Sequence, residues 1–258
     1  MLKVRVIPTL LWKNVGLVKG VGFDSWRRVG TVLPAIKVYN AREVDELMLF
    51  DITATIEQRD PDYESIHEFC AESFVPLTYG GGIRNVGQIR ELLRAGADKV
   101  SINSAAYENP DLIMDGARRF GSQCIVVSID AKKNDAGGYE CVRRCGTQST
   151  GLCPIEWARK AQSLGAGEIL VTSVERDGSM QGYDLELTRR VAEAVNIPVI
   201  ASGGAGNYEH MLAALQEGRA SAVAAASIFH FTQQTPREAK RFLAPHGILV
   251  RDAHAAAN

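Results

Sequence analysis

The chain has 258 residues, 46% of them hydrophobic, which is enough to bury a large core in one or two domains. Its formal net charge of −1 argues against a mainly electrostatic partner such as nucleic acid or an anionic membrane. No apolar run is long enough to span a membrane, no signal-peptide pattern begins the chain, and the five cysteines form no CxxC pair, so we expect a cytoplasmic protein with reduced thiols and no metal or cofactor.

Eight short segments rich in Val and Ile predict β-strands at residues 4–10, 46–51, 75–79, 98–102, 123–129, 168–172, 197–201 and 220–225. Helical patterns separate them, and two of these have apolar faces, formed by Ile89, Leu92, Leu93 and Ala97 and by Met211, Leu212, Ala214 and Leu215. Asn109-Pro110 and Thr235-Pro236 are typical of helix starts with proline in the first turn.

The second half of the chain repeats the first. Residues 75–82 (VPLTYGGG) are echoed by residues 197–204 (IPVIASGG), and Pro76 and Pro198 stand 122 positions apart. Alternating strands and helices indicate a parallel sheet in the α/β class. Their number and the half-to-half repeat favour a closed (β/α)8 TIM barrel over an open doubly wound sheet. We therefore predict one barrel domain, residues 1–258, built from two similar halves.

Two segments between strands are long. Residues 16–30 follow the first strand, and residues 132–153 follow the fifth, with Gly137-Gly138 suggesting a hairpin. Loops that follow barrel strands lie at the catalytic end, so both segments are candidate lids.

Small residues end four of the predicted strands. Gly81-Gly82 and Asn103-Ser104 do so in the first half, and Gly203-Gly204 and Ala226-Ser227 do so in the second. Glycines by themselves need only mean tight turns. Their pairing at matching positions predicts two phosphate sites and hence a long substrate with a phosphate at each end. Arg84, Lys19 and arginines of the long segments are candidates for added positive charge.

Four charged residues stand near strand starts: Arg5, Glu46, Lys99 and Glu168. They either reach solvent as ordinary surface charges or point inward and pair, because unpaired buried charge is too costly. Pairing would give a salt-bridged ring closing one end of the barrel. The pattern alone leaves these alternatives about even.

Carboxylates follow three strands: Asp51, Asp130 and Asp177. This is where barrel enzymes carry acid–base groups, although Asp also caps loops, and Asp177 precedes a glycine. Asp130 is therefore the main acid–base candidate. A Ser-His-Asp triad has no support in the sequence.

Several stretches together resemble the cyclase subunit of imidazole glycerol phosphate synthase, in the histidine biosynthesis family. They include LFDITA (49–54), GADKVSIN (96–103), RDG (176–178) and IASGGAG (200–206), and the likeness covers nearly the whole chain. The resemblance implies a lyase-type enzyme that takes ammonia from a class-I glutaminase partner. The ammonia would pass through the barrel to a bis-phosphorylated ribulosyl substrate, on which an imidazole ring closes.

The resemblance also assigns roles to residues. It makes Arg5, Glu46, Lys99 and Glu168 an ammonia gate, and Asp98 and Gln123 part of the docking face for the glutaminase. The phosphate-binding residues would be Gly82, Asn103 and Ser104 on one side and Gly178, Gly204, Ala226 and Ser227 on the other. Asp130 would be catalytic, with Lys19, Asp51 and Asp177 in support.

One departure from the family pattern concerns catalysis. The family's first catalytic Asp belongs in the segment IPTLLWK (7–13), where Leu11 takes its place beside an atypical Trp12. Leucine cannot hold a proton. Three hypotheses follow: the family reaction with Lys13, Asp51 or Asp177 substituting; a divergent paralogue that docks a glutaminase and supplies ammonia elsewhere, as in amidine formation on a surface sugar; or a sugar-phosphate isomerase of the same superfamily.

Overall fold

The computed structural model describes residues 3–14 and 16–251. Its strands are β1 (Arg5–Lys13), β2 (Gly16–Val21), β3 (Asp24–Gly30), β4 (Leu47–Asp51), β5 (Leu77–Gly80), β6 (Lys99–Ile102), β7 (Ile125–Lys133), β8 (Tyr139–Arg143), β9 (Gln148–Ser149), β10 (Glu168–Ser173), β11 (Val199–Ser202) and β12 (Ala222–Ala225). Its α-helices are α1 (Val32–Ala41), α2 (Tyr63–Glu72), α3 (Val86–Arg94), α4 (Ser104–Glu108), α5 (Asp111–Phe120), α6 (Pro154–Ser163), α7 (Leu185–Ala192), α8 (Tyr208–Gln216), α9 (Ser227–Phe231) and α10 (Pro236–Leu243). Two 3-10 turns are η1 (Ser122–Cys124) and η2 (Ala244–His246).

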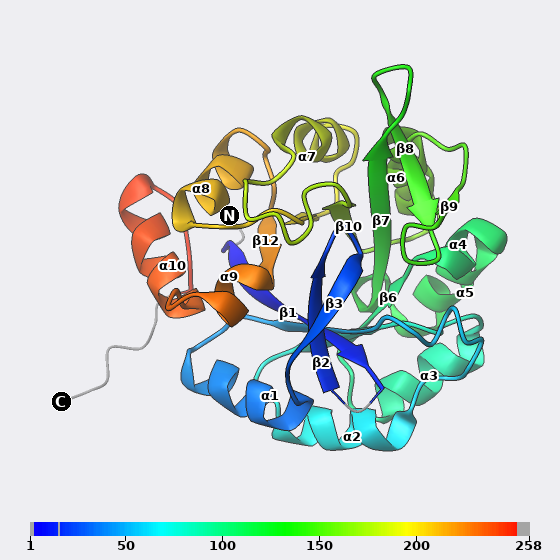
Figure 1. Ribbon diagram of the computed structural model, residues 1–258. Helices are drawn as coiled ribbons and strands as arrows, with labels where there is room; N and C mark the ends of the chain where they lie inside the picture. The colour runs from blue at the N-terminus through cyan, green and yellow to red at the C-terminus, as the bar shows by residue number, and fades with distance from the viewer. Residues whose placement is uncertain (1–2, 15, 252–258) are drawn as a thin grey trace.

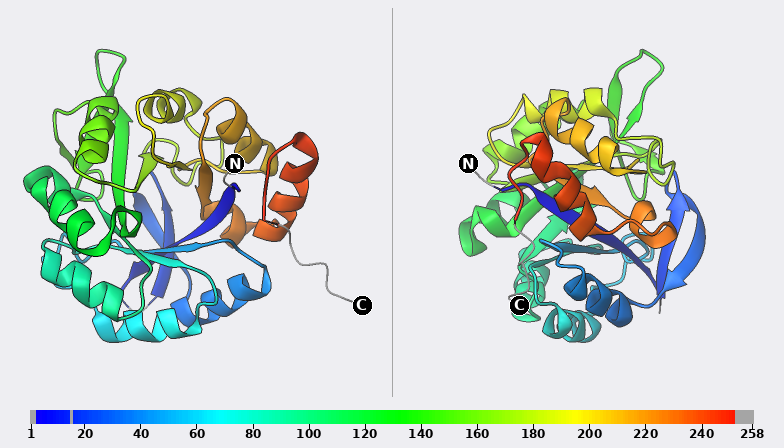
Figure 2. Two further views of the ribbon diagram at one scale, coloured as in Figure 1. Left: turned by 180° about the vertical axis from the view of Figure 1, so that it is seen from behind. Right: turned by 90° about the vertical axis from the view of Figure 1, so that its left-hand side faces the viewer.

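A closed parallel barrel forms the centre of the molecule. Its strands pair in the order β1, β4, β5, β6, β7, β10, β11 and β12, and β12 pairs with β1 from Arg5 opposite Ala222 to Pro8 opposite Ala225. Helices surround the strands (Figures 1 and 2). The prediction of an α/β (β/α)8 TIM barrel is confirmed. The predicted domain limits, 1–258, stay a prediction because residues 1–2, 15 and 252–258 lie outside the described residues.

The twofold repeat is visible in the positions of the elements. β5 and β11 begin and end 122 residues apart, at 77 and 199 and at 80 and 202, and the helices that follow them, α3 and α8, keep the same offset. Both helices are capped by asparagine: Asn85 accepts a hydrogen bond from the amide of Gln88 at 3.0 Å, and Asn207 accepts one from the amide of His210 at 2.8 Å.

The helices predicted from apolar faces and from Pro110 and Pro236 are present in the structure. Ile89 and Leu92 of α3 and Met211 of α8 are buried against the strands. Thr235 and Glu238 form a capping box at the start of α10, which begins at Pro236 as predicted. α5 begins at Asp111, one residue after Pro110.

Strand boundaries shift for local reasons. β5 and β11 begin two residues later than predicted, directly after Pro76 and Pro198, because proline has no N–H to donate to the ladder. β1 and β7 run on to Lys13 and Lys133, beyond the predicted ends, because each continues into an antiparallel hairpin.

The interpretation of residues 16–30 as a loop is wrong. They form the hairpin β2–β3, in which β2 pairs with β1 and Val18 stands opposite Leu11. β3 is mostly exposed, so its composition is polar and resembles that of a loop. The hairpin predicted around Gly137 is confirmed: the amide of Asn134 donates to the carbonyl of Gly138 at 3.0 Å, and β7 pairs with β8.

The barrel interior is layered. Inside it, an apolar cluster is separate from the larger core between strands and helices, and it consists of Ile7, Met48, Val126, Leu170, Ile200, Ala222 and Ala224, with Phe50 packed against it. Charged side chains lie at the amino-terminal ends of the strands, and polar side chains lie at the carboxyl-terminal ends. The apolar layer separates these two groups.

Candidate active site

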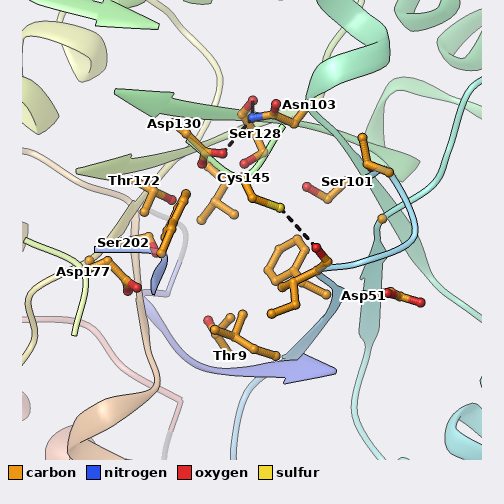
Figure 3. A pocket seen from close by; sticks show the side chains of 18 of the residues that line it. Thr9, Asp51, Ser101, Asn103, Ser128, Asp130, Cys145, Thr172, Asp177 and Ser202 are labelled. Atoms are coloured by element: carbon orange, nitrogen blue, oxygen red, sulfur yellow. Dashed lines mark hydrogen bonds between the residues drawn. The ribbon is translucent and has the colours of Figure 1, made fainter. Parts of the chain in front are cut away.

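A cavity of about 340 Å³ opens at the carboxyl-terminal ends of the barrel strands. It is lined by all seven predicted phosphate-binding residues and by Leu11, Lys19, Asp51, Asp130 and Asp177. Figure 3 shows that the labelled side chains around this space come from different strands and from the loops that follow them. Residues far apart in the sequence are thus brought together in one site.

The predicted phosphate-binding glycines also have structural reasons to be glycine. Gly204 has φ +112°, and an added Cβ would stand 2.1 Å from the carbonyl oxygen of Gly182. At Gly178 it would stand 2.2 Å from the carbonyl oxygen of Gly20. These contacts alone require glycine, so the glycine pattern by itself does not argue for an anion.

The two serines differ in a way that the sequence repeat hides. The Ser104 hydroxyl accepts a hydrogen bond from the amide of Arg144 at 3.0 Å. The Ser227 hydroxyl is buried and has no hydrogen-bond partner in the described part of the chain. Buried polar groups are normally paired, so Ser227 is the phosphate-site residue that most needs a ligand.

Asp130 has the properties of an acid–base group. It ends the barrel part of β7 and accepts a hydrogen bond from the side-chain amide of Asn103 at 3.1 Å. Burial, reinforced by the nearby Asp177 carboxylate and partly offset by a hydrogen bond from Ser128, raises the pKa of Asp130 to about 7. A group with this pKa exchanges protons readily at neutral pH.

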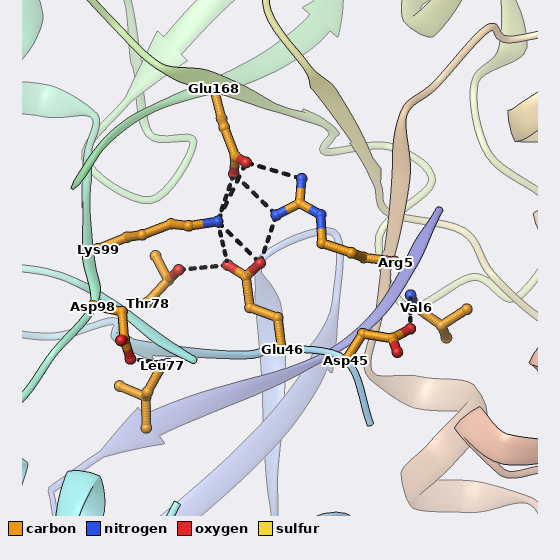
Figure 4. A network of polar contacts seen from close by, with 9 residues as sticks. All are labelled: Arg5, Val6, Asp45, Glu46, Leu77, Thr78, Asp98, Lys99 and Glu168. Carbon is orange, nitrogen blue, oxygen red and sulfur yellow. Dashed lines mark hydrogen bonds and ion pairs between the residues drawn. The ribbon is translucent and has the colours of Figure 1, made fainter. Parts of the chain in front are cut away.

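Four charges close the opposite end of the barrel (Figure 4). We call Arg5, Glu46, Lys99 and Glu168 the charged ring. Arg5 contacts Glu46 at 2.5 Å and Glu168 at 2.9 Å, and Lys99 contacts them at 3.0 and 3.1 Å. Each cation thus touches both carboxylates. These four side chains therefore point into the barrel and pair with one another, rather than reaching solvent as separate surface charges.

The charged ring is partly shielded from water. The Glu46 side chain is 2% exposed and also accepts a hydrogen bond from Thr78 at 2.8 Å. Burial works against the charge of Arg5, but Glu46 and Glu168 outweigh it and raise the pKa of Arg5. The side chains of Arg5 and Lys99 remain 22% and 16% exposed at the amino-terminal end of the barrel.

Comparison with known families places this barrel. A family model described as "Histidine biosynthesis protein" matches residues 5–235, which include every barrel strand. The chain belongs to the histidine biosynthesis protein family. Members of this family are barrel enzymes of the cyclase and isomerase types, and the predicted family membership is confirmed.

Leu11, which the resemblance places where the family has a catalytic Asp, lies inside the cavity itself. β1 alternates its side chains, so Leu11 lines the cavity while Trp12 points to the opposite side and packs edge-on against Phe69, with ring centroids 5.3 Å apart. Trp12 therefore belongs to the outer core. Leu11 faces the cavity, where its side chain can carry no proton.

Of the three residues expected to substitute for the family's Asp, two are already engaged and the third lies elsewhere. Asp51 pairs with Arg59 at 2.8 Å and accepts the amides of Thr53 and Ala54, both at 3.0 Å. Asp177 pairs with the buried Lys19 at 2.6 Å. Lys13 does not line the cavity.

The residues assigned to partner docking lie at the amino-terminal ends of the strands. Asp98 and Gln123 are both exposed, and Asp98 accepts a hydrogen bond from the amide of Leu77 at 2.8 Å. Phe74, which the sequence did not single out, stands just before β5 and is 83% exposed.

Arg144, one of the arginines of the long segment 132–153 that were candidates for added positive charge, lines the cavity. Sequence reasoning assigned no role to Ser101 and Cys145, which line it as well. Cys145 belongs to a segment with no strand periodicity, so no sequence signal placed it in the site. In the described residues, no group of three or more His, Cys, Asp or Glu side chains is placed to hold a metal ion. None of the helices within residues 3–14 and 16–251 is long and apolar enough to cross a membrane.

Proposed function

We propose that this chain is the cyclase-type subunit of a glutamine amidotransferase. A class-I glutaminase docks at the amino-terminal ends of the barrel strands and releases ammonia there. The ammonia passes the charged ring and the apolar interior and reacts with a bis-phosphorylated ribulosyl substrate in the cavity.

The charged ring is the observation that carries this proposal. Buried ion pairs are often no more stabilising than apolar residues of the same volume, so stability alone does not account for them. Here the ring covers an apolar interior that leads to the cavity holding Asp130. The isomerase hypothesis gives these four charges no task.

Leu11 favours a second candidate function. With one acid–base group absent, ring closure would be weak, and the barrel would chiefly dock a glutaminase and supply ammonia to another reaction. Amidine formation on a surface sugar is one reaction of this class.

The test mixes the purified chain with the class-I glutaminase encoded nearest to it and supplies glutamine labelled with ¹⁵N in the amide. We expect a complex, a rise in glutaminase activity, and ¹⁵N in the product even with unlabelled ammonium present. If the two proteins neither associate nor show a rise in glutaminase activity, the proposal is refuted. Activation without turnover of the bis-phosphorylated substrate would favour the second candidate function.

A further inference from the structure

Cys145 enters the cavity from the connection between β8 and β9. Arg144, Cys145 and Gly146 have φ values of 51°, 56° and 76°, so the chain makes a left-handed turn there. The amide of Arg144 donates to the Ser104 hydroxyl at 3.0 Å, and Lys132 donates to the Gly146 carbonyl at 2.8 Å. These contacts hold the Cys145 side chain in the cavity near Asp130 (Figure 3).

The Cys145 thiol makes one hydrogen bond within the protein. It donates to the backbone carbonyl of Ile52 at 3.1 Å, a weak interaction for sulfur that the thiol must exchange for one to the ligand before its proton is transferred. Burial and then the carboxylates of Asp130 and Asp51 raise the pKa of Cys145 to about 11. The thiol is therefore protonated at neutral pH, whereas Asp130 titrates near pH 7.

Buried hydroxyls in the same cavity point to a ligand. Ser101 and Ser227 are 4% and 5% exposed, and their hydroxyls, like that of Thr9, have no hydrogen-bond partner among the described residues. An unpaired buried hydroxyl is unfavourable, so these groups favour a polar ligand in the cavity that Cys145 also lines.

We propose that Cys145 is the second proton-transfer residue of this site, acting with Asp130 on the substrate carbon that receives ammonia. The thiol supplies the proton that the side chain of Leu11 cannot supply. This inference rests on the proposed function, because that function provides both the ammonia and the carbonyl substrate.

The proton balance of the step is complete. Ammonia adds to the carbonyl carbon, the C–O π bond opens, and the oxygen takes the thiol proton, leaving a thiolate. The Asp130 carboxylate removes one proton from the new C–NH₃⁺ group. The proton on Asp130 then returns to the thiolate, in the direction that the pKa order of the two groups favours, so both groups are restored.

A single-turnover assay tests this role. Excess protein is mixed with the bis-phosphorylated ribulosyl substrate and ammonium chloride, for the wild type, Cys145→Ala and the control Cys153→Ala. Cys153 precedes α6 and does not line the cavity. Loss of a general acid typically costs about 10²-fold or more, so we expect that loss for Cys145→Ala and none for Cys153→Ala. In a Leu11→Asp background, Cys145→Ala should cost much less.

Alkylation by iodoacetamide, followed by mass spectrometry, reports directly on substrate contact. We expect the substrate to slow labelling of Cys145 at least tenfold and to leave labelling of Cys153 unchanged, even where turnover is too slow to measure. Substrate binding without protection, or Cys145→Ala turnover equal to the wild type, overturns the role of Cys145 and leaves the proposed function standing. If calorimetry detects no binding of the substrate to any of these proteins, both the proposed function and the role of Cys145 are overturned.

Discussion

Leu11 and Asp130 face the same cavity with opposite chemical capacities. Burial and the nearby Asp177 raise the pKa of Asp130 to about 7, so this carboxyl group is about half-ionised at neutral pH. Leu11, which lines the same cavity, carries no proton. A reaction that needs two carboxylates therefore has one of them here. The other carboxylates of the cavity, Asp51 and Asp177, are occupied by Arg59 and Lys19.

For Leu11 we predict little or no steady-state formation of imidazole glycerol phosphate from free ammonia, even at high ammonia concentration. The Cys145 thiol, whose pKa is raised to about 11, is a poorer acid than a carboxyl group, so the remaining slow reaction is the one that a single-turnover assay measures. Free ammonia bypasses the glutaminase and the charged ring, so this assay measures only the chemistry of the cavity. Loss of a positioned acid or base typically costs about 10²–10⁴ in rate, and more where two groups act as a unit. Leu11→Asp should recover part of the rate. Wild-type turnover close to that of an ordinary cyclase would contradict this interpretation.

Asp130→Asn should stabilise the protein at high pH. The pKa of Asp130 is about 7 in the folded protein, above its ordinary value of 3.8, so the folded state holds this proton more tightly than the unfolded chain. The resulting stability is complete below about pH 4 and is lost as the pH rises through 7. At 1.36 kcal/mol per pKa unit the cost approaches about 4 kcal/mol.

We therefore expect Asp130→Asn to raise the melting temperature at about pH 8, to leave it nearly unchanged at about pH 4, and to abolish turnover. Asp51→Asn is the matched control. It should lower the melting temperature at pH 8, because it removes the buried carboxylate that pairs with Arg59 and accepts the amides of Thr53 and Ala54, and leaves Arg59 with Glu57 alone. A lower melting temperature for Asp130→Asn at pH 8 would show that the folded protein stabilises the ionised form of Asp130 and would contradict the raised pKa.

Among the elements, the short helices α4 and α9 begin at equivalent positions of the two half-barrels, at Ser104 and Ser227. Their hydroxyls differ, since Ser104 is bonded within the protein and Ser227 is not. Replacing the glycines would test phosphate binding poorly, because a Cβ at Gly204 would collide with the backbone of Gly182. Serine substitutions leave the backbone intact.

Ser227→Ala should weaken binding of a pentose bisphosphate about five- to fifteenfold, corresponding to one net hydrogen bond of about 1–1.5 kcal/mol. Calorimetry measures this change. Ser163→Ala, an exposed position on α6, provides the control and should have no effect. Unchanged affinity in Ser227→Ala would remove this hydroxyl from the proposed phosphate site.

The hairpin β2–β3 is fastened to the loop after β10. Lys19 pairs with Asp177 at 2.6 Å, and the amide of Gly22 donates to the carbonyl of Asp177 at 2.9 Å. On the outer side, the guanidinium of Arg27 lies 3.7 Å from the centre of the Phe231 ring on α9. The hairpin therefore covers the cavity through contacts with the second half-barrel.

Lys19→Met should loosen this cover. Removing one partner of a buried pair costs about 3–5 kcal/mol, because the other charge stays buried without compensation. We expect faster proteolytic cleavage within residues 16–30 and a lower melting temperature. Lys37→Met removes an exposed partner of Glu72 and should change neither quantity measurably. Equal protease resistance in both variants would argue against Lys19 as the fastening.

For the whole molecule, the two ends of the barrel carry different chemistry. The charged ring has two positive and two negative side chains, so it closes one end without net charge. The apolar layer above it excludes ions but presents no charge to a small neutral molecule such as ammonia. The proposed passage of ammonia from a partner at one end to a substrate at the other would need this arrangement.

Lys99→Met should affect the reaction with ammonia derived from glutamine much more than the reaction with free ammonium. It leaves Glu46 and Glu168 with Arg5 as their remaining partner in the ring, and the uncompensated charge should disturb the ring and lower stability. We expect amide-¹⁵N incorporation from glutamine to fall about tenfold or more, while the single-turnover rate with free ammonium stays within about twofold of the wild type. An equal loss with both nitrogen sources would place the effect of Lys99 in the cavity instead.

The sequence by itself determined the barrel, its twofold repeat and the candidate acid–base and phosphate-binding residues of the cavity. Strand periodicity and strand-ending residues are local properties, and in a parallel barrel the carboxyl ends of all strands meet at one face. Asp130, Asn103 and Ser227 could therefore be assigned to one site before any contact was known.

Only the tertiary structure decided which of these groups are free to act. In the fold, the side chains of Arg5, Glu46, Lys99 and Glu168 point inward. Asp51 and Asp177 are paired with Arg59 and Lys19, and the Ser227 hydroxyl has no hydrogen-bond partner among the described residues. The fold also brought Cys145 from an irregular segment to Asp130. Pairing and burial depend on neighbours distant in the chain, and the pKa and reactivity of a side chain follow from those neighbours rather than from its own position in the sequence.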